Sequence, residues 1–380
     1  MVLSPAPDMP DVTVVGTPAV KITGVRTVPV DLPLAEPFRT AIHDIRSIGC
    51  LLVFVETDQG LVGESYLWLS SARRLKVLDT MVASLADLVV GRNPEDVRSI
   101  WQDMWDAVEL LDRRGVTMFA ISALEVACWD LVGKSRDLSV SRLFGRVRDR
   151  IPVYADGGLF TTMSIPELVA QAEGFVEKGF RAMKMRLGPP TLAETVERVA
   201  AIRAAIGPDV ALMADANQGL SLVEALRLGR GLEPYRLDWF EEPIPAHDLD
   251  GAARLAAALD TPIALGQSVY NRYGFAEVVG RRAAGVLMPD LQRIGGVCEF
   301  IKVAHMAETM DIPITPHLFT EQSLQLAAIL PNCCYAERMS WFDPLYAELP
   351  EMVDGCLVIP DRPGLGVPFD EQAVARFRAA

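Results

Sequence analysis

Seven polar residues in the second half of the chain each follow a short apolar run. In chain order they are Lys184, Asp215, Glu241, Gln267, Asp290, His317 and Glu337. Successive members are 20 to 31 residues apart, about the length of one strand plus one helix. Taken singly, each fits a helix N-cap or a structural ion pair. In a (β/α)8 barrel, however, the carboxyl ends of the strands meet at one mouth, so the regular spacing predicts one shared site.

Three of these residues carry oxygens that suit a hard cation. Asp215, Glu241 and Gln267 follow three consecutive predicted strands. Mg2+ binds such oxygens and keeps positions free for water or substrate. A carboxylate on the ion would be polarised, so that its α-proton could be removed to give an enediolate. The sequence therefore predicts Mg2+ as cofactor and a small-molecule carboxylate as substrate.

A base for that proton is available on a later strand. Of the four histidines, only His317 follows a predicted strand, and Asp290 one strand earlier can orient its ring and increase its basicity. Glu337, on the far side, could give a proton or a hydrogen bond to the second carboxylate oxygen. Lys184 and Arg186 alternate on one strand and so share a face.

The elements that would position these residues are repeated βα units after Pro152. Apolar runs at 153–156, 182–187, 210–214, 237–240, 263–265, 285–288 and 312–315 alternate with amphipathic helices such as 165–178, 192–205, 222–231 and 299–310. Such repeats imply a parallel sheet, and their number predicts a TIM barrel. No GxGxxG or GxxxxGK[ST] motif is present, which weighs against nucleotide chemistry.

The first part of the chain has a different pattern. Residues 21–62 show period-two, β-branched alternation, with a hairpin turn at 58–60, and residues 72–145 have helical spacing. Strands followed by helices predict an α+β domain. We expect a tail over 1–20, the α+β domain over 21–150, the barrel over 151–345, and a segment over 346–380 that returns to the first domain.

Composition narrows the class of partner. The net charge is −14, which disfavours nucleic acid and anionic lipid. No uninterrupted apolar run approaches a membrane span, and the first twenty residues lack the features of a signal peptide. The six cysteines form no CxxC pair. We expect a soluble, cytoplasmic protein with no nucleic-acid or membrane partner.

The chain resembles the enolase superfamily, and within it the mandelate racemase/muconate lactonizing enzyme subgroup. The resemblance runs from about residue 25 to 368 and is most specific at 127–131, 240–243, 288–297 and 316–319. It implies a modified (β/α)7β barrel with an α+β capping domain, and a homo-oligomer. It also implies a reaction that begins with abstraction of the proton α to a magnesium-bound carboxylate.

The resemblance also implies roles for particular residues. Asp215, Glu241 and Gln267 would be metal ligands, while Lys184, Arg186, Asp290, His317 and Glu337 would be catalytic. Asn217 falls where the subgroup often has an asparagine near the ligand. Arg39, His43 and Tyr66 of the capping domain would contact substrate. A charged lid suits a polyhydroxylated or dicarboxylic acid, although the same charges also fit an exposed loop.

Two residues depart from the family pattern. Gln267 replaces a glutamate, which weakens cation affinity but leaves a stronger Lewis acid. Arg186 replaces a lysine, and a guanidinium is a poor base because it is effectively always protonated. One-base chemistry follows: dehydration of a polar 2-hydroxy acid such as a sugar acid. The alternatives are a racemase or epimerase of a 2-hydroxy acid, and a catalytically impaired relic that binds a carboxylate.

Overall fold

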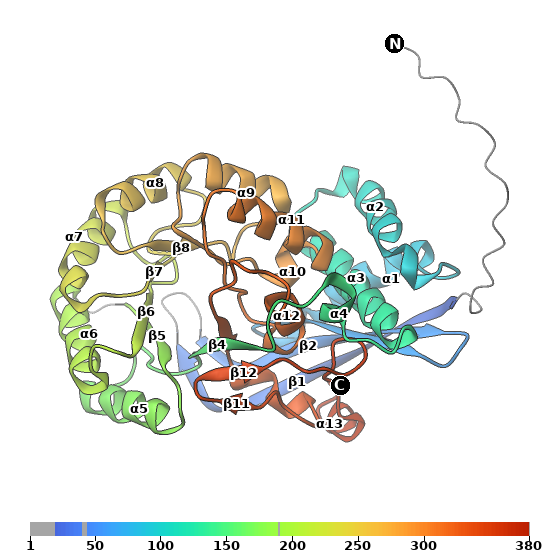
Figure 1. The fold of residues 1–380 in the computed structure, drawn as a ribbon, viewed down its shortest axis with the longest axis horizontal. Helices are drawn as coiled ribbons and strands as arrows, with labels where there is room; N and C mark the ends of the chain where they lie inside the picture. Colours follow the sequence, from blue (N-terminus) through green and yellow to red (C-terminus); the bar gives the residue numbers. More distant parts are fainter. Residues whose placement is uncertain (1–19, 40–43, 189–190, 380) are drawn as a thin grey trace, which may run out of the picture.

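The computed structural model describes residues 20–39, 44–188 and 191–379. Within them, a closed barrel surrounded by helices packs beside an α+β domain, as predicted (Figure 1). The prediction of a modified (β/α)7β barrel with an α+β capping domain is confirmed.

The capping domain is a three-stranded antiparallel sheet covered by helices. Its strands are β1 (Ile22–Arg39), β2 (Asp44–Thr57) and β3 (Val62–Leu69), in that order. Its helices are α1 (Leu75–Leu85), α2 (Val97–Ala107), α3 (Val116–Ser135) and α4 (Val140–Phe144), with 3-10 turns η1 (Ala72–Arg74), η2 (Ala86–Leu88), η3 (Pro94–Asp96) and η4 (Glu109–Leu111).

Strand β2 is buried on both faces, which explains its unbroken apolar sequence. Leu51 and Val53 pack with the cap helices, whereas the alternate residues Cys50 and Leu52 belong to the core shared with the barrel. Side chains of a strand point alternately to its two faces, so one strand joins the two hydrophobic cores.

Helix α3 is apolar almost all round because it is the central helix of the cap. Among the described residues it is the one helix long and apolar enough to cross a membrane, with a mean hydropathy of 1.5. Yet 89% of that apolar window is buried inside the protein, as expected for a core helix.

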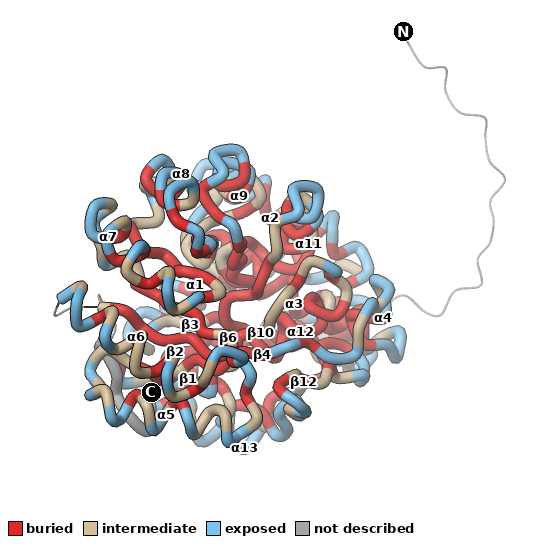
Figure 2. Tube along the Cα trace, turned by 60° about the vertical axis from the view of Figure 1, so that its left-hand side comes forward, coloured by how far each residue is buried: buried red, intermediate tan, exposed pale blue. Residues whose placement is uncertain are grey.

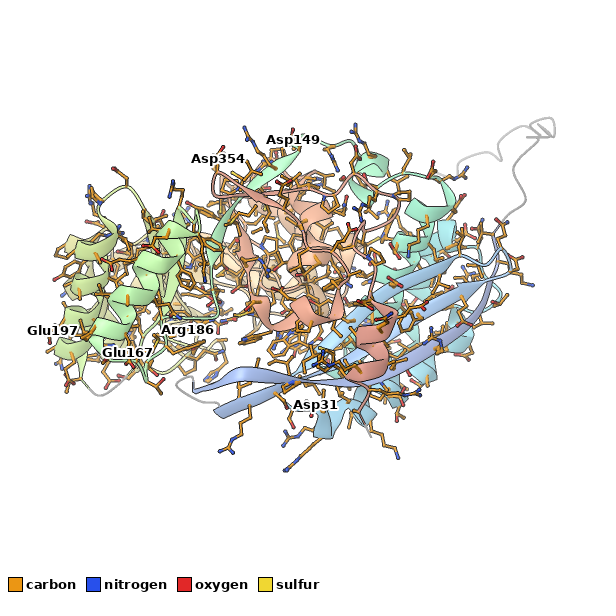
Figure 3. The ribbon with its side chains drawn as sticks, turned by 90° about the horizontal axis from the view of Figure 1, so that it is seen from below. Asp31, Asp149, Glu167, Arg186, Glu197 and Asp354 are labelled. Atoms are coloured by element: carbon orange, nitrogen blue, oxygen red, sulfur yellow. The ribbon has the colours of Figure 1, made fainter. Side chains whose placement is uncertain are left out.

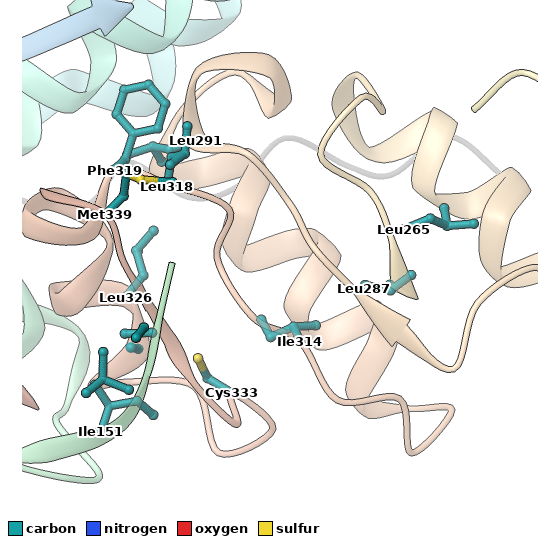
Figure 4. Packing of buried hydrophobic residues seen from close by; sticks show 14 of the residues in the cluster. Ile151, Leu265, Leu287, Leu291, Ile314, Leu318, Phe319, Leu326, Cys333 and Met339 are labelled. Atoms are coloured by element: carbon teal, nitrogen blue, oxygen red, sulfur yellow. The ribbon is translucent and has the colours of Figure 1, made fainter. Parts of the chain in front are cut away.

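The barrel consists of short parallel strands that close on themselves. They are β4 (Arg150–Ala155), β5 (Ala182–Arg186), β6 (Ala211–Asp215), β7 (Phe240–Glu241), β8 (Ile263–Leu265), β9 (Val286–Leu287) and β10 (Ala336–Arg338). Strand β10 pairs with β4 and closes the ring. The strand predicted at 312–315 is reduced to bridges from Ile314 to Leu287 and to Cys333, which keep its place in the barrel (Figure 4).

Helices surround the strands, and most of them have one face exposed and the other buried against the strands (Figure 2). They are α5 (Ile165–Glu177), α6 (Leu192–Ile206), α7 (Leu222–Leu232), α8 (Leu249–Ala258), α9 (Asn271–Gly280), α10 (Leu291–Ile294), α11 (Val297–Glu308) and α12 (Thr320–Ala327), with 3-10 turns η5 (Glu233–Tyr235) and η6 (Ser340–Leu345). Capping boxes at Ser164 and Ser221 fix where α5 and α7 begin.

The C-terminal residues touch both parts of the molecule. Strands β11 (Met352–Val353) and β12 (Cys356–Val358) extend the barrel sheet from β4. After α13 (Glu371–Arg376), the amide of Ala379 bonds to the carbonyl of Pro29 on β1 at 2.9 Å.

The cap is docked on the barrel segment that follows Asp290. Ser122 donates to the carbonyl of Leu291 at 2.7 Å, and Trp101 donates to that of Gly295 at 2.8 Å. The buried carboxylate of Glu125 accepts the amides of Val297 and Cys298 at 2.8 and 2.9 Å. Cap helices therefore hold the loop that carries one of the predicted catalytic residues.

Candidate active site

Neighbouring strands bring the predicted residues to one end of the barrel. In the parallel register Arg186 lies opposite Asp215, and Asp215 opposite Glu241. Figure 3 shows Arg186 at the end of the barrel toward which β1 and β2 of the cap extend. The side chains that follow these strands therefore stand at one level, as their spacing predicted.

Lys184 is fully buried among carboxylates. Its Nζ lies 3.0 Å from Oε2 of Glu241, 3.0 Å from Oε1 of Glu337 and 3.4 Å from Oδ2 of Asp156. Burial by itself lowers the pKa of Lys184, but Glu241 and Glu337 outweigh it, so that the pKa is raised well above its usual value. Lys184 is therefore a fixed positive charge.

Arg186 is held by two carboxylates. Its Nη2 lies 2.6 Å from Oδ2 of Asp156, and its Nη1 pairs with Asp215. The contacts of a guanidinium with two carboxylates are charge-assisted and directional. Asp156, which sequence reasoning missed, directly follows β4 and lies 28 residues before Lys184, so the same spacing could have found it.

Glu337 is ionised despite its burial. Burial alone would raise the pKa of Glu337. The charge of Lys184 and a hydrogen bond with Asp156 outweigh burial and lower the pKa to about 2. One oxygen contacts Lys184, and the other accepts the amide of Leu318 at 2.6 Å. The ionised carboxylate of Glu337 carries no proton, so the proton donation predicted for it is disfavoured. Its contact with Lys184 instead holds that ammonium in place.

His317 and Asp290 form a hydrogen-bonded pair. Nδ1 of His317 lies 2.7 Å from Oδ2 of Asp290. Burial raises the pKa of Asp290, but Arg293 and His317 outweigh it, and the pKa is lowered overall. An anionic Asp290 favours the tautomer with hydrogen on Nδ1, which leaves Nε2 of His317 as an acceptor.

A cavity of about 150 Å³ lies between the barrel mouth and the cap. Its wall combines polar and apolar side chains: Ile45, Trp68, Arg186, Asn217, Gln218, Glu242, Gln267, Ser268, Arg293, His317, Leu318, Met339 and Trp341. Arg186, Asn217, Gln267 and His317 were among the residues predicted from the sequence. Gln218, Glu242, Ser268, Arg293 and the two tryptophans were not.

The structure does not bring all predicted substrate contacts to this cavity. Tyr66 is buried against Phe319 and Phe342, outside the cavity wall, whereas Trp68, two residues further along β3, lines it. The side chain of Arg39 and the whole of His43 lie outside the described residues. Substrate contacts by Arg39 and His43 therefore stay predictions.

The predicted metal ligands are two carboxylates and one amide. Among the described residues, no group of three or more His, Cys, Asp and Glu is arranged to hold a metal ion. Asp215 and Glu241 are adjacent in register, and the third predicted ligand, Gln267, is an amide on the cavity wall. The backbone N of Asn217 donates to Asp215, and the buried Oδ1 of Asn217 has no hydrogen-bond partner within the part of the chain that the structure describes.

Charge balance is consistent with one divalent cation at this position. Two cations, Lys184 and Arg186, face four carboxylates: Asp156, Asp215, Glu241 and Glu337. The cluster therefore has two negative charges in excess when all four are ionised, and one when Asp156, whose pKa is raised by burial, holds a proton. Its donor set fits magnesium, which prefers oxygen ligands, provided that Arg186 releases Asp215.

Sequence profiles of two domains cover most of the chain. The mandelate racemase/muconate lactonizing enzyme N-terminal domain matches residues 22–145, and an enolase C-terminal domain-like profile matches residues 167–373. Together they span both the capping domain and the barrel.

Characterised relatives match over nearly their full length. L-Talarate/galactarate dehydratase of Salmonella typhimurium is 31% identical over 348 residues, covering 90% of this chain and 87% of that protein. 3,6-Anhydro-alpha-L-galactonate cycloisomerase of Streptomyces coelicolor is 33% identical over 356 residues, which cover 93% of this chain and 98% of that protein.

Solved structures agree with this relationship. The L-talarate dehydratase of Polaromonas sp. JS666, crystallised with Mg and L-glucarate, superimposes with a TM-score of 0.88 at 33% identity. That match covers 95% of this chain and 98% of the other. The resemblance read from the motifs is confirmed, and the chain belongs to the mandelate racemase/muconate lactonizing enzyme family of the enolase superfamily.

Proposed function

We propose that this protein is a magnesium-dependent acid-sugar dehydratase. It removes the proton α to the carboxylate of a polyhydroxylated acid and expels the β-hydroxyl as water. The observation that carries the proposal is the difference between two basic groups at the mouth. His317 faces the cavity with Nε2 available, whereas Arg186 is paired with two carboxylates.

The relatives support this choice of reaction and substrate class. Besides the three enzymes named above, D-galactonate dehydratase of Ralstonia pickettii is 33% identical over 347 residues. The predicted dehydration of a sugar acid agrees with the names of the three dehydratases among these four enzymes. Our sequence-based expectations of a homo-oligomer and a cytoplasmic location stay part of the proposal.

Asp215, Glu241 and Gln267 would hold the magnesium ion. When bound, the ion polarises the substrate carboxylate and stabilises the negative charge that develops on its oxygens. Arg186 must then move its Nη1 from Asp215, and a substrate carboxylate offers this guanidinium a replacement partner. Lys184, held by Glu337 and Glu241, contributes a fixed positive charge beside the same carboxylate.

His317 carries the proton in the proposed reaction. Its Nε2 accepts the α-proton, and Asp290 stabilises the imidazolium through Nδ1. The protonated ring then gives its proton to the departing β-hydroxyl. Arg186 stays protonated throughout, because its pKa is raised further by Asp156 and Glu241 even though burial opposes this. Only one base therefore acts on the α-carbon.

A second function is favoured by one specific contact. Arg186 pairs with Asp215, a predicted metal ligand, and Gln267 offers no charge at the third position. Both features fit a relic that binds a carboxylate without metal or turnover.

Incubation with a panel of sugar acids tests the two functions. Galactarate, galactonate and arabinonate are supplied with Mg2+, and formation of the 2-keto-3-deoxy acid is followed by NMR. A dehydratase gives this product from at least one acid, and chelation of Mg2+ stops it. Binding of the acids with no product and no α-proton exchange would support the relic.

A further inference from the structure

Glu242, beside the predicted metal ligand Glu241, has a buried carboxylate oxygen without a partner. The residue is 3% exposed and follows β7 at the barrel mouth. Its Oε2 accepts a hydrogen bond from Nε2 of Gln218 at 2.7 Å, whereas its Oε1 has no hydrogen-bond partner among the described residues. Glu242 also lines the cavity. An acceptor left unpaired at a binding cavity is costly unless a ligand supplies the missing donor.

The surrounding hydrogen bonds fix where Glu242 points. Gln218 donates to Ser268 at 3.1 Å and accepts the amide of Ala246 at 2.9 Å, so its side chain is held at both ends. The backbone amide of Gln218 also donates to the carbonyl of Glu242 at 2.7 Å. The free oxygen is therefore preorganised.

The backbone around this oxygen adopts an uncommon conformation. Asn217, Gln218 and Glu242 have φ values of 45°, 62° and 33°. Non-glycine residues seldom occupy the left-handed region, and such strain concentrates at binding and catalytic sites. Here it accompanies a second buried acceptor without a partner, Oδ1 of Asn217, on the same cavity wall.

Different residues of the cavity wall suit different parts of a ligand. Arg186 and Arg293 are the cationic groups that line the cavity and suit a carboxylate. Glu242 would repel a carboxylate but can accept a bond from a neutral hydroxyl. Trp68 and Trp341, with ring centroids 5.9 Å apart, offer an apolar surface for the C–H groups of a polyol chain.

We infer that Glu242 is a specificity-determining residue that accepts a hydrogen bond from a substrate hydroxyl. The ligand class is thus narrowed to carboxylic acids with at least one hydroxyl placed to reach Oε1. Hydrogen bonds to a carboxylate are among the stronger ones, and a site built around such a bond rejects analogues that lack the hydroxyl. This inference rests on the proposed function, since it assumes that an acid sugar occupies the cavity.

Calorimetric binding of two probes in the presence of Mg2+ tests the inference. Galactarate and adipate are both six-carbon dicarboxylates, but adipate has no hydroxyl. We expect wild-type protein to bind galactarate more tightly, and Glu242→Leu to lose roughly tenfold or more in galactarate affinity while adipate affinity is unchanged or improved. Glu242→Gln, which keeps an acceptor oxygen and the side-chain shape, should retain part of the preference.

Glu321→Gln is the matched control. Glu321 is also a buried glutamate with an unpartnered oxygen, but it lies on α12 outside the cavity wall. Its replacement should leave the galactarate-to-adipate ratio unchanged. If Glu242→Leu and Glu242→Gln both keep the wild-type ratio, the inference is overturned while the proposed function stands. If wild-type protein binds none of galactarate, galactonate and arabinonate, both are overturned.

Discussion

The two sides of the barrel mouth surround their basic groups differently. On β5, Lys184 and Arg186 are buried among four carboxylates and keep their protons. Around the barrel, His317 has one carboxylate partner and an imidazole edge at the cavity. The contrast indicates that the β5 side supplies fixed charge and the His317 side supplies proton transfer. A catalytic base must have an acceptor atom at the cavity, and Nε2 of His317 is such an atom, whereas the Lys184 and Arg186 cations are occupied by carboxylates.

The largest expected effect comes from removing the proposed base. His317→Asn should lower α-proton exchange of every sugar acid by about 10²–10⁴-fold, because the amide cannot accept the proton. Deuterium incorporation measured by NMR in D2O checks this. His305→Asn, on the exposed side of α11, is the control and should exchange normally. Exchange that survives in His317→Asn would place the base elsewhere.

Removal of the buried ammonium of Lys184 should destabilise the fold more than replacement of His317. Lys184→Met leaves Glu241 and Glu337 without their shared cation, and breaking a buried ion pair costs about 3–5 kcal/mol. Chemical denaturation with and without Mg2+ measures the loss. His317→Asn, in contrast, should cost less, since it leaves Asp290 paired with Arg293. Equal losses of stability in Lys184→Met and His317→Asn would show that the Lys184 cluster is no more important for folding than His317.

Arg186 should compete with the cation for Asp215. Arg186→Gln frees that carboxylate and removes one positive charge. We expect Mg2+ to bind roughly tenfold more tightly, because one repulsion between unit charges near a protein surface is lost. Calorimetric titration of the protein without substrate reports this directly. Gln267→Glu should act in the same direction. Unchanged affinity in Arg186→Gln would mean that the guanidinium does not occupy the metal position.

Buried carboxylates with and without a nearby ammonium should change stability with pH in opposite directions. Burial raises the pKa of Glu321 to about 7, and Arg338 offsets only part of this rise, whereas Lys184 holds the pKa of Glu337 at about 2. A raised folded-state pKa means that stability is lost as pH rises from about 4.5 toward 7. For Glu337 the sign is opposite, and stability is lost as pH falls from about 4.5 toward 2.

Denaturation of Glu321→Gln at several pH values tests this sign. Relative to wild type, the variant should become more stable as pH rises from 5 to 8, because it has no proton to lose; a pKa raised from 4.5 to about 7 corresponds to about 3 kcal/mol at most. Glu173→Gln, at an exposed position on α5, controls for the substitution itself. A flat difference across this range would contradict the raised pKa of Glu321.

The sequence was sufficient to predict the barrel and most residues at its mouth, because both depend on the spacing of strands along the chain. Residues that follow strands at intervals of one βα unit must meet at one end of a barrel. Asp156 fits the same rule but was not predicted, because it was counted within the apolar run 153–156. Strands β7 and β9, of two residues each, are shorter than their apolar runs because the hydrogen bonds to neighbouring strands, not apolar sequence, determine where a strand ends.

Other features depend on side-chain positions that spacing does not determine. Tyr66 and Trp68 share one face of β3, so alternation cannot tell which reaches the cavity. Glu241 and Glu242 are adjacent and chemically alike, and only the structure shows that one contacts Lys184 and the other Gln218. The pairing of Arg186 with Asp215 likewise depends on the side-chain conformations.

The stereochemistry of α-proton exchange tests the one-base account most directly. Wild-type protein with Mg2+ is incubated in D2O with sugar acids that differ only in configuration at the α-carbon, and exchange is followed by NMR. We predict exchange at one configuration only, with the opposite one gained in Arg186→Lys, where a lysine beside Lys184 and the metal can titrate toward neutral pH. Exchange of both configurations by wild-type protein, with one of them lost in Arg186→Ala, would show that Arg186 acts as a base and would contradict the account.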